Sequence, residues 1–125
     1  MNATNCTGFV VVVDDEEDTR ELLRELLEAR GYQVATAQDG VEALDVVGNL
    51  PRVCLMILDL LMPRMDGNEV LQRLSTKGAS QFPVWVSTSV PDRAPAGVPC
   101  LPKPVDVGRL LTLVDEHCAA ESSCA

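Results

Sequence analysis

Three acidic side chains follow two apolar segments of the chain. Asp14 and Asp15 come directly after the apolar run 9–13, and Asp59 comes directly after the apolar run 53–58. Runs of this length and composition predict strands buried on both faces of a parallel sheet. Open α/β sheets bind their ligands at the carboxyl ends of such strands. Three carboxylates gathered there would suit a hard cation together with a phosphoryl group.

Two further residues stand at the ends of later apolar segments. Thr88 follows the run 84–87, and Lys103 follows the run 98–101 and precedes Pro104. A hydroxyl and an ammonium could hold phosphoryl oxygens, which with a carboxylate nucleophile and a metal completes a set for phosphoryl transfer. A threonine at a strand end is, taken singly, more often structural. The Lys103–Pro104 bond is a candidate cis peptide.

Strands and helices alternate along the sequence. The predicted strands are 9–13, 32–36, 53–58, 84–87 and 98–101. The predicted helices are 17–30, a segment capped by Asp39, a short segment around 70–74, and a last helix capped by Asp106. Alternation of this kind predicts an α/β domain with one doubly wound, five-stranded parallel sheet. The flavodoxin-like order 2-1-3-4-5 is taken from common doubly wound folds rather than from the residues.

Composition excludes several classes of function. The chain has 125 residues, which suits one domain, and its net charge of −9 argues against nucleic-acid binding. Its apolar runs are too short to span a bilayer, and the first eight residues are too polar for a secretory signal. We therefore expect a cytoplasmic protein without membrane or nucleic-acid partners.

The five cysteines include no Cys-x-x-Cys pair. Cys54 and Cys100 fall in apolar runs and are predicted to be buried thiols that act as small hydrophobic side chains. This pattern does not indicate a disulfide framework, which also favours a reducing cytoplasm.

Taken together, these motifs resemble those of the receiver domain of bacterial two-component response regulators. They are Val12-Val13-Asp14-Asp15-Glu16, the string from Asp59 to Gly67, Thr88 after an apolar strand, and Lys103-Pro104. The resemblance covers residues 9–118, which leaves 1–8 and 119–125 as expected flexible tails. It implies that Asp59 accepts phosphate from a sensor histidine kinase or phosphotransfer protein and that the domain signals to a downstream protein partner.

The resemblance also implies a role for each site residue. Mg²⁺ is expected on Asp15, Asp59 and the backbone carbonyl of Leu61, with Asp14 acting through water. Lys103 is expected to pair with the phosphoryl group and Thr88 to move toward it. Ser87 and Ser89 flank Thr88, so the hydroxyl residue could differ by one position.

The chain departs from the family pattern at several positions. The family's aromatic residue three positions before the lysine is Cys100 here, so the usual aromatic readout is in doubt. The segment between Thr88 and Lys103 is short and rich in proline, which predicts a fourth helix that is shortened or absent. Without that helix the usual dimer surface is altered, and a monomer or weak dimer is expected. Leu61 and Val90 offer no side chain to position water, which predicts slow hydrolysis of the phosphate.

Two other functions compete with this interpretation. One is a phosphatase of the haloacid-dehalogenase type, which needs a second acid two residues after its nucleophile. Leu61 occupies that position and cannot transfer a proton, which weighs against the phosphatase. The other is a receiver-like interaction module that works without phosphorylation, because a fold alone does not establish a function.

Overall fold

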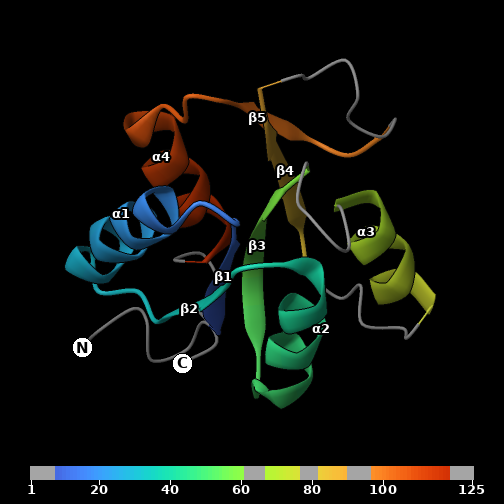
Figure 1. Ribbon diagram of the computed structural model, residues 1–125. Coiled ribbons are helices and arrows are strands. Elements are labelled where there is room, and N and C mark those ends of the chain that lie inside the picture. The colour runs from blue at the N-terminus through green and yellow to red at the C-terminus, as the bar shows by residue number, and fades with distance from the viewer. Residues whose placement is uncertain (1–7, 61–66, 77–81, 90–96, 119–125) are drawn as a thin grey trace.

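The structure, a computed structural model, describes residues 8–60, 67–76, 82–89 and 97–118. Within these residues strands and helices alternate in the order that the sequence predicts (Figure 1). The strands are β1 (Phe9–Val13), β2 (Val34–Ala37), β3 (Val53–Asp59), β4 (Val84–Thr88) and β5 (Cys100–Pro102). The helices are α1 (Glu17–Ala29), α2 (Gly40–Asn49), α3 (Gly67–Thr76) and α4 (Val107–His117).

All neighbouring strands pair in parallel, in the order β2-β1-β3-β4-β5. This confirms the doubly wound sheet of the flavodoxin-like type. The register pairs Val13 with Leu58 and Asp59 with Ser87, so β1, β3 and β4 reach the same edge of the sheet. Residues that follow these strands therefore emerge side by side.

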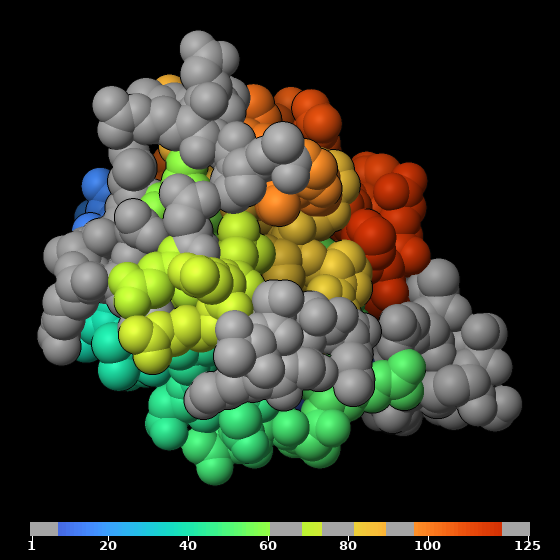
Figure 2. Space-filling model, turned by 90° about the vertical axis from the view of Figure 1, so that its right-hand side faces the viewer, coloured from blue at the N-terminus to red at the C-terminus, as the bar shows by residue number. Residues whose placement is uncertain are grey.

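Helices cover both faces of the sheet. Helices α1 and α4 lie on one face and α2 and α3 on the other (Figure 1). The space-filling view shows α3 beside α2 on the second face, where the two helices are in contact (Figure 2). Side chains alternate along β1, so Val10 and Val12 enter the α1/α4 core while Val11 and Val13 enter the α2/α3 core.

The helix ends follow the capping signals in the sequence. The carboxylate of Asp39 accepts a hydrogen bond from the backbone N–H of Glu42, and that of Asp106 accepts one from Arg109. Each such cap stabilises its helix by about 1 kcal/mol. After α1, Gly31 has a φ of 93°, a left-handed conformation that glycine adopts without steric cost.

Apolar side chains line the sheet-facing sides of the first and last helices. Leu23 and Leu27, four residues apart on α1, are buried, whereas Leu22 is 52% exposed because it lies off that line. On the last helix, Leu110 and Val114 are buried. Leu113 is buried with them, and Leu111 is only partly buried.

The prediction that Cys54 is a free thiol is wrong. Cys54 and Cys118 form a disulfide with a Cα–Cα distance of 5.4 Å, which links β3 to the end of α4. Sequence separation concealed the pair, because packing of α4 over β3 brings together residues 64 positions apart. In the chain-entropy model a closed loop of that size adds about 4 kcal/mol of stability. Cys100 is free and partly exposed, so the cysteines no longer support a reducing environment.

Several sequence predictions fall outside the described residues. They concern the two tails, the carbonyl of Leu61, the side chain of Val90 and the helix expected to be missing within 90–96. Among the described helices, none is both long enough and apolar enough to cross a membrane.

Side chains at the end of α1 tether the last turn of α4. The Tyr32 hydroxyl donates a hydrogen bond to the Asp115 carboxylate, which also pairs with Arg30. Tyr32 is buried, whereas Arg30 and Asp115 are both more than a third exposed. The Tyr32 hydrogen bond is therefore worth more to the fold than the solvated ion pair.

We expect Tyr32→Phe to lower the free energy of unfolding by about 1 kcal/mol at neutral pH, because it removes this hydrogen bond and keeps the ring. Burial, the hydrogen bond to Asp115 and its negative charge raise the pKa of Tyr32 above its ordinary value. The pKa of Tyr32 is thus higher in the folded state than in the unfolded state, where it is about 10. The folded state is fully stabilised by the neutral hydroxyl below this pH, and the stabilisation is lost as the pH rises above it. Urea denaturation from about pH 9 to about 11 should therefore show a smaller decrease in the free energy of unfolding for the variant than for the wild type. If the free energy of unfolding depended equally on pH in both proteins, the raised pKa of Tyr32 would be contradicted.

Candidate functional site

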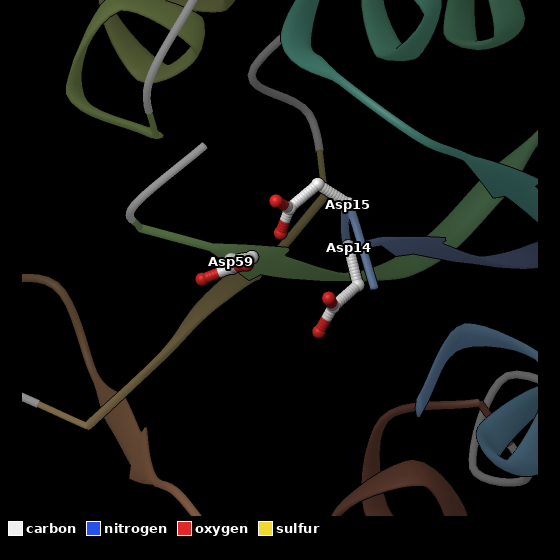
Figure 3. A group of neighbouring side chains, drawn as sticks. All are labelled: Asp14, Asp15 and Asp59. Carbon is white, nitrogen blue, oxygen red and sulfur yellow. The ribbon is translucent and has the colours of Figure 1, made fainter. Parts of the chain in front are cut away.

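The carboxyl ends of β1 and β3 bring the three predicted acidic residues together. Ligand oxygens of Asp14, Asp15 and Asp59 all lie within 4.8 Å of one another. The side chains project beyond the ends of the two strands (Figure 3). Asp14 and Asp59 are buried, whereas Asp15 is exposed. Two of the carboxylates are thus held inside the protein, and the third stands at the mouth of the site.

Lys103 joins this group from the end of β5. Its Nζ lies 3.0 Å from an Asp14 oxygen and 3.4 Å from an Asp59 oxygen. The backbone N–H of Lys103 donates to the carbonyl of Thr88, which continues the pairing of β4 with β5. The Lys103–Pro104 peptide bond is cis. The ammonium is therefore positioned by the sheet and lies between two buried carboxylates.

The electrostatics of Lys103 follow from these neighbours. Partial burial by itself would lower the pKa of the ammonium. The hydrogen bond to Asp14 and the negative charges of Asp14 and Asp59 outweigh burial, so the pKa is raised above its ordinary value. Lys103 is consequently a fixed positive charge at neutral pH.

A cavity of about 330 Å³ opens beside the acidic group. Its lining consists of Asp15, Glu16, Asp59, Thr88, Ser89 and Lys103. Thr88 and Ser89 both line it. Ser87 does not line it: its hydroxyl is buried and makes no hydrogen bond among the described residues. The hydroxyl residue expected from the sequence therefore borders the same space as Asp59 and Lys103.

Local contacts fix the orientation of Asp14. One carboxylate oxygen accepts a hydrogen bond of 2.9 Å from the backbone N–H of Glu16, while the other contacts Lys103. The Asp14 carbonyl accepts a hydrogen bond of 2.8 Å from Arg20 on α1. Sequence reasoning missed the contribution of Arg20 and named Ser89 only as an alternative to Thr88. Arg20 carried no signal in the sequence, because it occupies an ordinary helix position.

Comparison with known proteins decides the family. The sequence-family model described as the response regulator receiver domain matches residues 10–115 of the chain. The chain belongs to the response regulator receiver domain family. The match includes both acidic strand ends, Thr88 and Lys103.

Relatives of this receiver domain support the same assignment. Response regulator MprA of Mycobacterium sp. (strain KMS) is 44% identical over 110 residues, which cover 82% of this chain and 46% of that protein. The chain thus spans about half the length of the curated relatives it matches.

Solved structures agree. The receiver domain of hybrid histidine kinase CckA matches with a TM-score of 0.76 and 34% identity, over 88% of this chain and 98% of that one. A response regulator receiver protein from Pseudomonas putida matches with a TM-score of 0.79 and 31% identity, over 88% of this chain and 97% of that one.

The acidic group of this receiver domain fits a divalent cation. Carboxylate oxygens are the ligands that Mg²⁺ takes in proteins. The three carboxylates and the Lys103 ammonium together leave two uncompensated negative charges. Asp15 is exposed and borders the cavity, so an ion with several bound waters has access to it. Asp15 and Asp59 are the residues that would hold it, with Asp14 close by.

We expect Asp15→Asn to weaken Mg²⁺ binding by about tenfold or more, because it removes one full charge from the cluster. Isothermal titration calorimetry of the unphosphorylated protein measures this directly. Asp45→Asn is the matched control, since Asp45 is an exposed acid on α2 outside the cluster. Equal affinities of the two variants would exclude Asp15 as a ligand.

Proposed function

We propose that this receiver domain accepts a phosphoryl group on Asp59 from a phosphohistidine of a sensor histidine kinase or phosphotransfer protein. One observation carries the proposal. The Lys103 ammonium lies 3.4 Å from an Asp59 oxygen, in a cavity also lined by Asp15 and Thr88. A nucleophile, a cation-binding acid, a fixed positive charge and a hydroxyl therefore face one space.

The chemistry follows from these positions. An Asp59 oxygen forms a bond to phosphorus while the phosphorus–nitrogen bond breaks, and the imidazole leaves with the electron pair and takes up a proton. Mg²⁺, when bound, neutralises charge on the phosphoryl oxygens. Lys103 supplies a second positive charge beside the acceptor and pairs with the acyl phosphate. Asp14 holds that ammonium in place, and Thr88 offers a hydroxyl to a phosphoryl oxygen.

Further elements of the proposal come from the family resemblance. The carbonyl of Leu61 is expected to complete the protein ligands of the cation. Leu61 and Val90 lack groups that activate water, so we expect a long-lived acyl phosphate. The phosphorylated domain then signals to a downstream protein partner, without nucleic-acid or membrane contacts of its own, as a cytoplasmic monomer or weak dimer. Cys100 replaces the family's aromatic residue, so this signal runs through another group.

Incubation with Mg²⁺ and phosphoramidate, a small donor with a phosphorus–nitrogen bond, tests the acceptor. We expect intact-mass analysis to show one added phosphoryl group that Asp59→Asn abolishes. Lys103→Met should slow the reaction by about 100-fold or more, because it removes the charge beside the acceptor. Asp45→Asn serves again as the control for a lost carboxylate.

The opposite outcome favours the alternative function. If the folded protein gains no phosphoryl group from any small donor, the domain is an interaction module that works without phosphorylation. Equal labelling of Asp59→Asn would show that another residue is the acceptor.

A groove beside the acceptor suits the approach of a protein donor. It has a volume of about 440 Å³ and shares Glu16, Ser89 and Lys103 with the acceptor cavity. Its walls are mostly apolar and come largely from α1, from the segment before α4 and from the first residue of α4. The apolar lining residues are Leu22, Leu23, Pro104, Val105 and Val107. A protein that delivers a phosphohistidine to Asp59 must cover this edge, where Leu22 is half exposed.

Leu22→Asp should separate protein donors from small ones. We expect transfer from a purified histidine kinase that phosphorylates the wild type to fall by about tenfold, because a charge enters the apolar contact. Transfer from phosphoramidate should stay unchanged. Val41→Asp is a matched control, because Val41 on α2 is equally exposed at 51% but outside the groove. Equal effects of the two variants on kinase transfer would contradict the contact.

A further inference from the structure

A covalent link joins two elements at the end of the molecule away from the acceptor. Cys54 is the second residue of β3, and Cys118 is the residue that ends α4. Cys54 and Asp59 are five positions apart along an extended strand, which corresponds to about 16 Å. The disulfide is therefore remote from the phosphoryl-transfer chemistry.

Helix α4 is fixed at both of its ends. Before it, Lys103 pairs with Asp14 and Asp59, and Asp106 caps its first turn. At its end, Cys118 is bonded to β3, and Asp115 accepts the hydrogen bond from Tyr32. Between these points Leu110, Leu113 and Val114 are buried against the sheet. Breaking the disulfide would remove the covalent attachment of α4 to β3 and leave the noncovalent contacts in place.

We propose that the Cys54–Cys118 pair is a thiol–disulfide switch that controls how firmly the last turn of α4 is attached to the sheet. Two molecules of a low-molecular-weight thiol supply two electrons and two protons. The first thiolate attacks one protein sulfur, breaks the disulfide and forms a mixed disulfide. The second releases the protein sulfur, which leaves two protein thiols and one small disulfide. The reverse exchange restores the link. This inference does not depend on phosphorylation of Asp59.

The reduced state is compatible with the fold. Cys54 and Cys118 are 1% and 0% exposed and sit among apolar neighbours. A buried thiol behaves as a small hydrophobic side chain, so both residues keep their packing after reduction. In the cytoplasm, where we propose that this domain works, disulfides are usually transient or redox-sensing. A reversible link therefore agrees with a protein whose core does not depend on it.

Burial also determines how the switch is operated. A thiol cannot reach either sulfur while α4 is docked, because thiol–disulfide exchange requires access to the attacked sulfur. The last turn of the helix must open first, and the Tyr32–Asp115 hydrogen bond opposes that opening. The rate of reduction should consequently depend on this tether.

Peptide mapping of the full-length protein after equilibration with glutathione and glutathione disulfide tests the proposal. We expect a Cys54–Cys118 linked peptide that disappears and returns as the ratio is varied. Reduction should accelerate hydrogen exchange of residues 113–118, leave residues 10–13 protected, and lower the Tm by about 10–15 °C. The far-ultraviolet circular dichroism should keep its helical signal below the new Tm.

Two variants test the access route. Tyr32→Phe should speed reduction about fivefold, as expected from the loss of one hydrogen bond that holds α4. Glu116→Ala, at an exposed position next to Asp115, should leave the rate unchanged. Cys100→Ser should leave the linked peptide unchanged, since Cys100 is free.

Three results would overturn the proposal. The first is separate alkylation of Cys54 and Cys118 at every glutathione ratio. The second is a link from either residue to another cysteine. The third is loss of the helical signal on reduction at room temperature, which would make the disulfide a structural requirement and not a switch.

Discussion

Parallel pairing of β3 with β1 and β4 is the constraint on which the rest of the structure depends. Because all three strands run in one direction, their carboxyl ends share one edge of the sheet. The same pairing places apolar side chains in two separate cores, under α1 and α4 on one face and under α2 and α3 on the other. Hydrophobic burial thus holds in place a group of acids that would otherwise repel one another.

Lys103 resolves much of that repulsion. Two buried carboxylates so close together are unfavourable in the absence of a positive charge. The ammonium between Asp14 and Asp59 supplies one, and these contacts raise its pKa despite partial burial. The remaining negative charge faces the cavity through the exposed Asp15. A site of this kind fits a divalent cation, and the phosphoryl transfer proposed above would use the same cavity.

Helix α4 connects this site to the remote end of the molecule. It begins shortly after Lys103 and ends at the disulfide to β3. Its buried face packs in the α1/α4 core, and its last turn is tethered to the end of α1. A helix attached in this way is placed to respond both to events at Asp59 and to the state of two cysteines. The two proposed inputs, phosphorylation of Asp59 and reduction of the disulfide, would act at opposite ends of this helix.

The sequence by itself determined the order of elements and the acidic strand ends. Apolar runs indicate which segments are strands. A parallel sheet brings Asp14, Asp15 and Asp59 together when the first and third strands are neighbours, and that order was taken from common doubly wound folds rather than from the residues. Lys103 and Thr88 were likewise predicted from their positions after the apolar runs 98–101 and 84–87.

Tertiary structure alone decided the features that depend on how helices dock. These are the disulfide between Cys54 and Cys118, the exposure of Leu22, the contact of Arg20 with the Asp14 carbonyl and the tether at Tyr32. Each depends on the rotation and depth at which a helix docks against its neighbours. No local pattern specifies these, because helix docking is set by side-chain packing across the whole core.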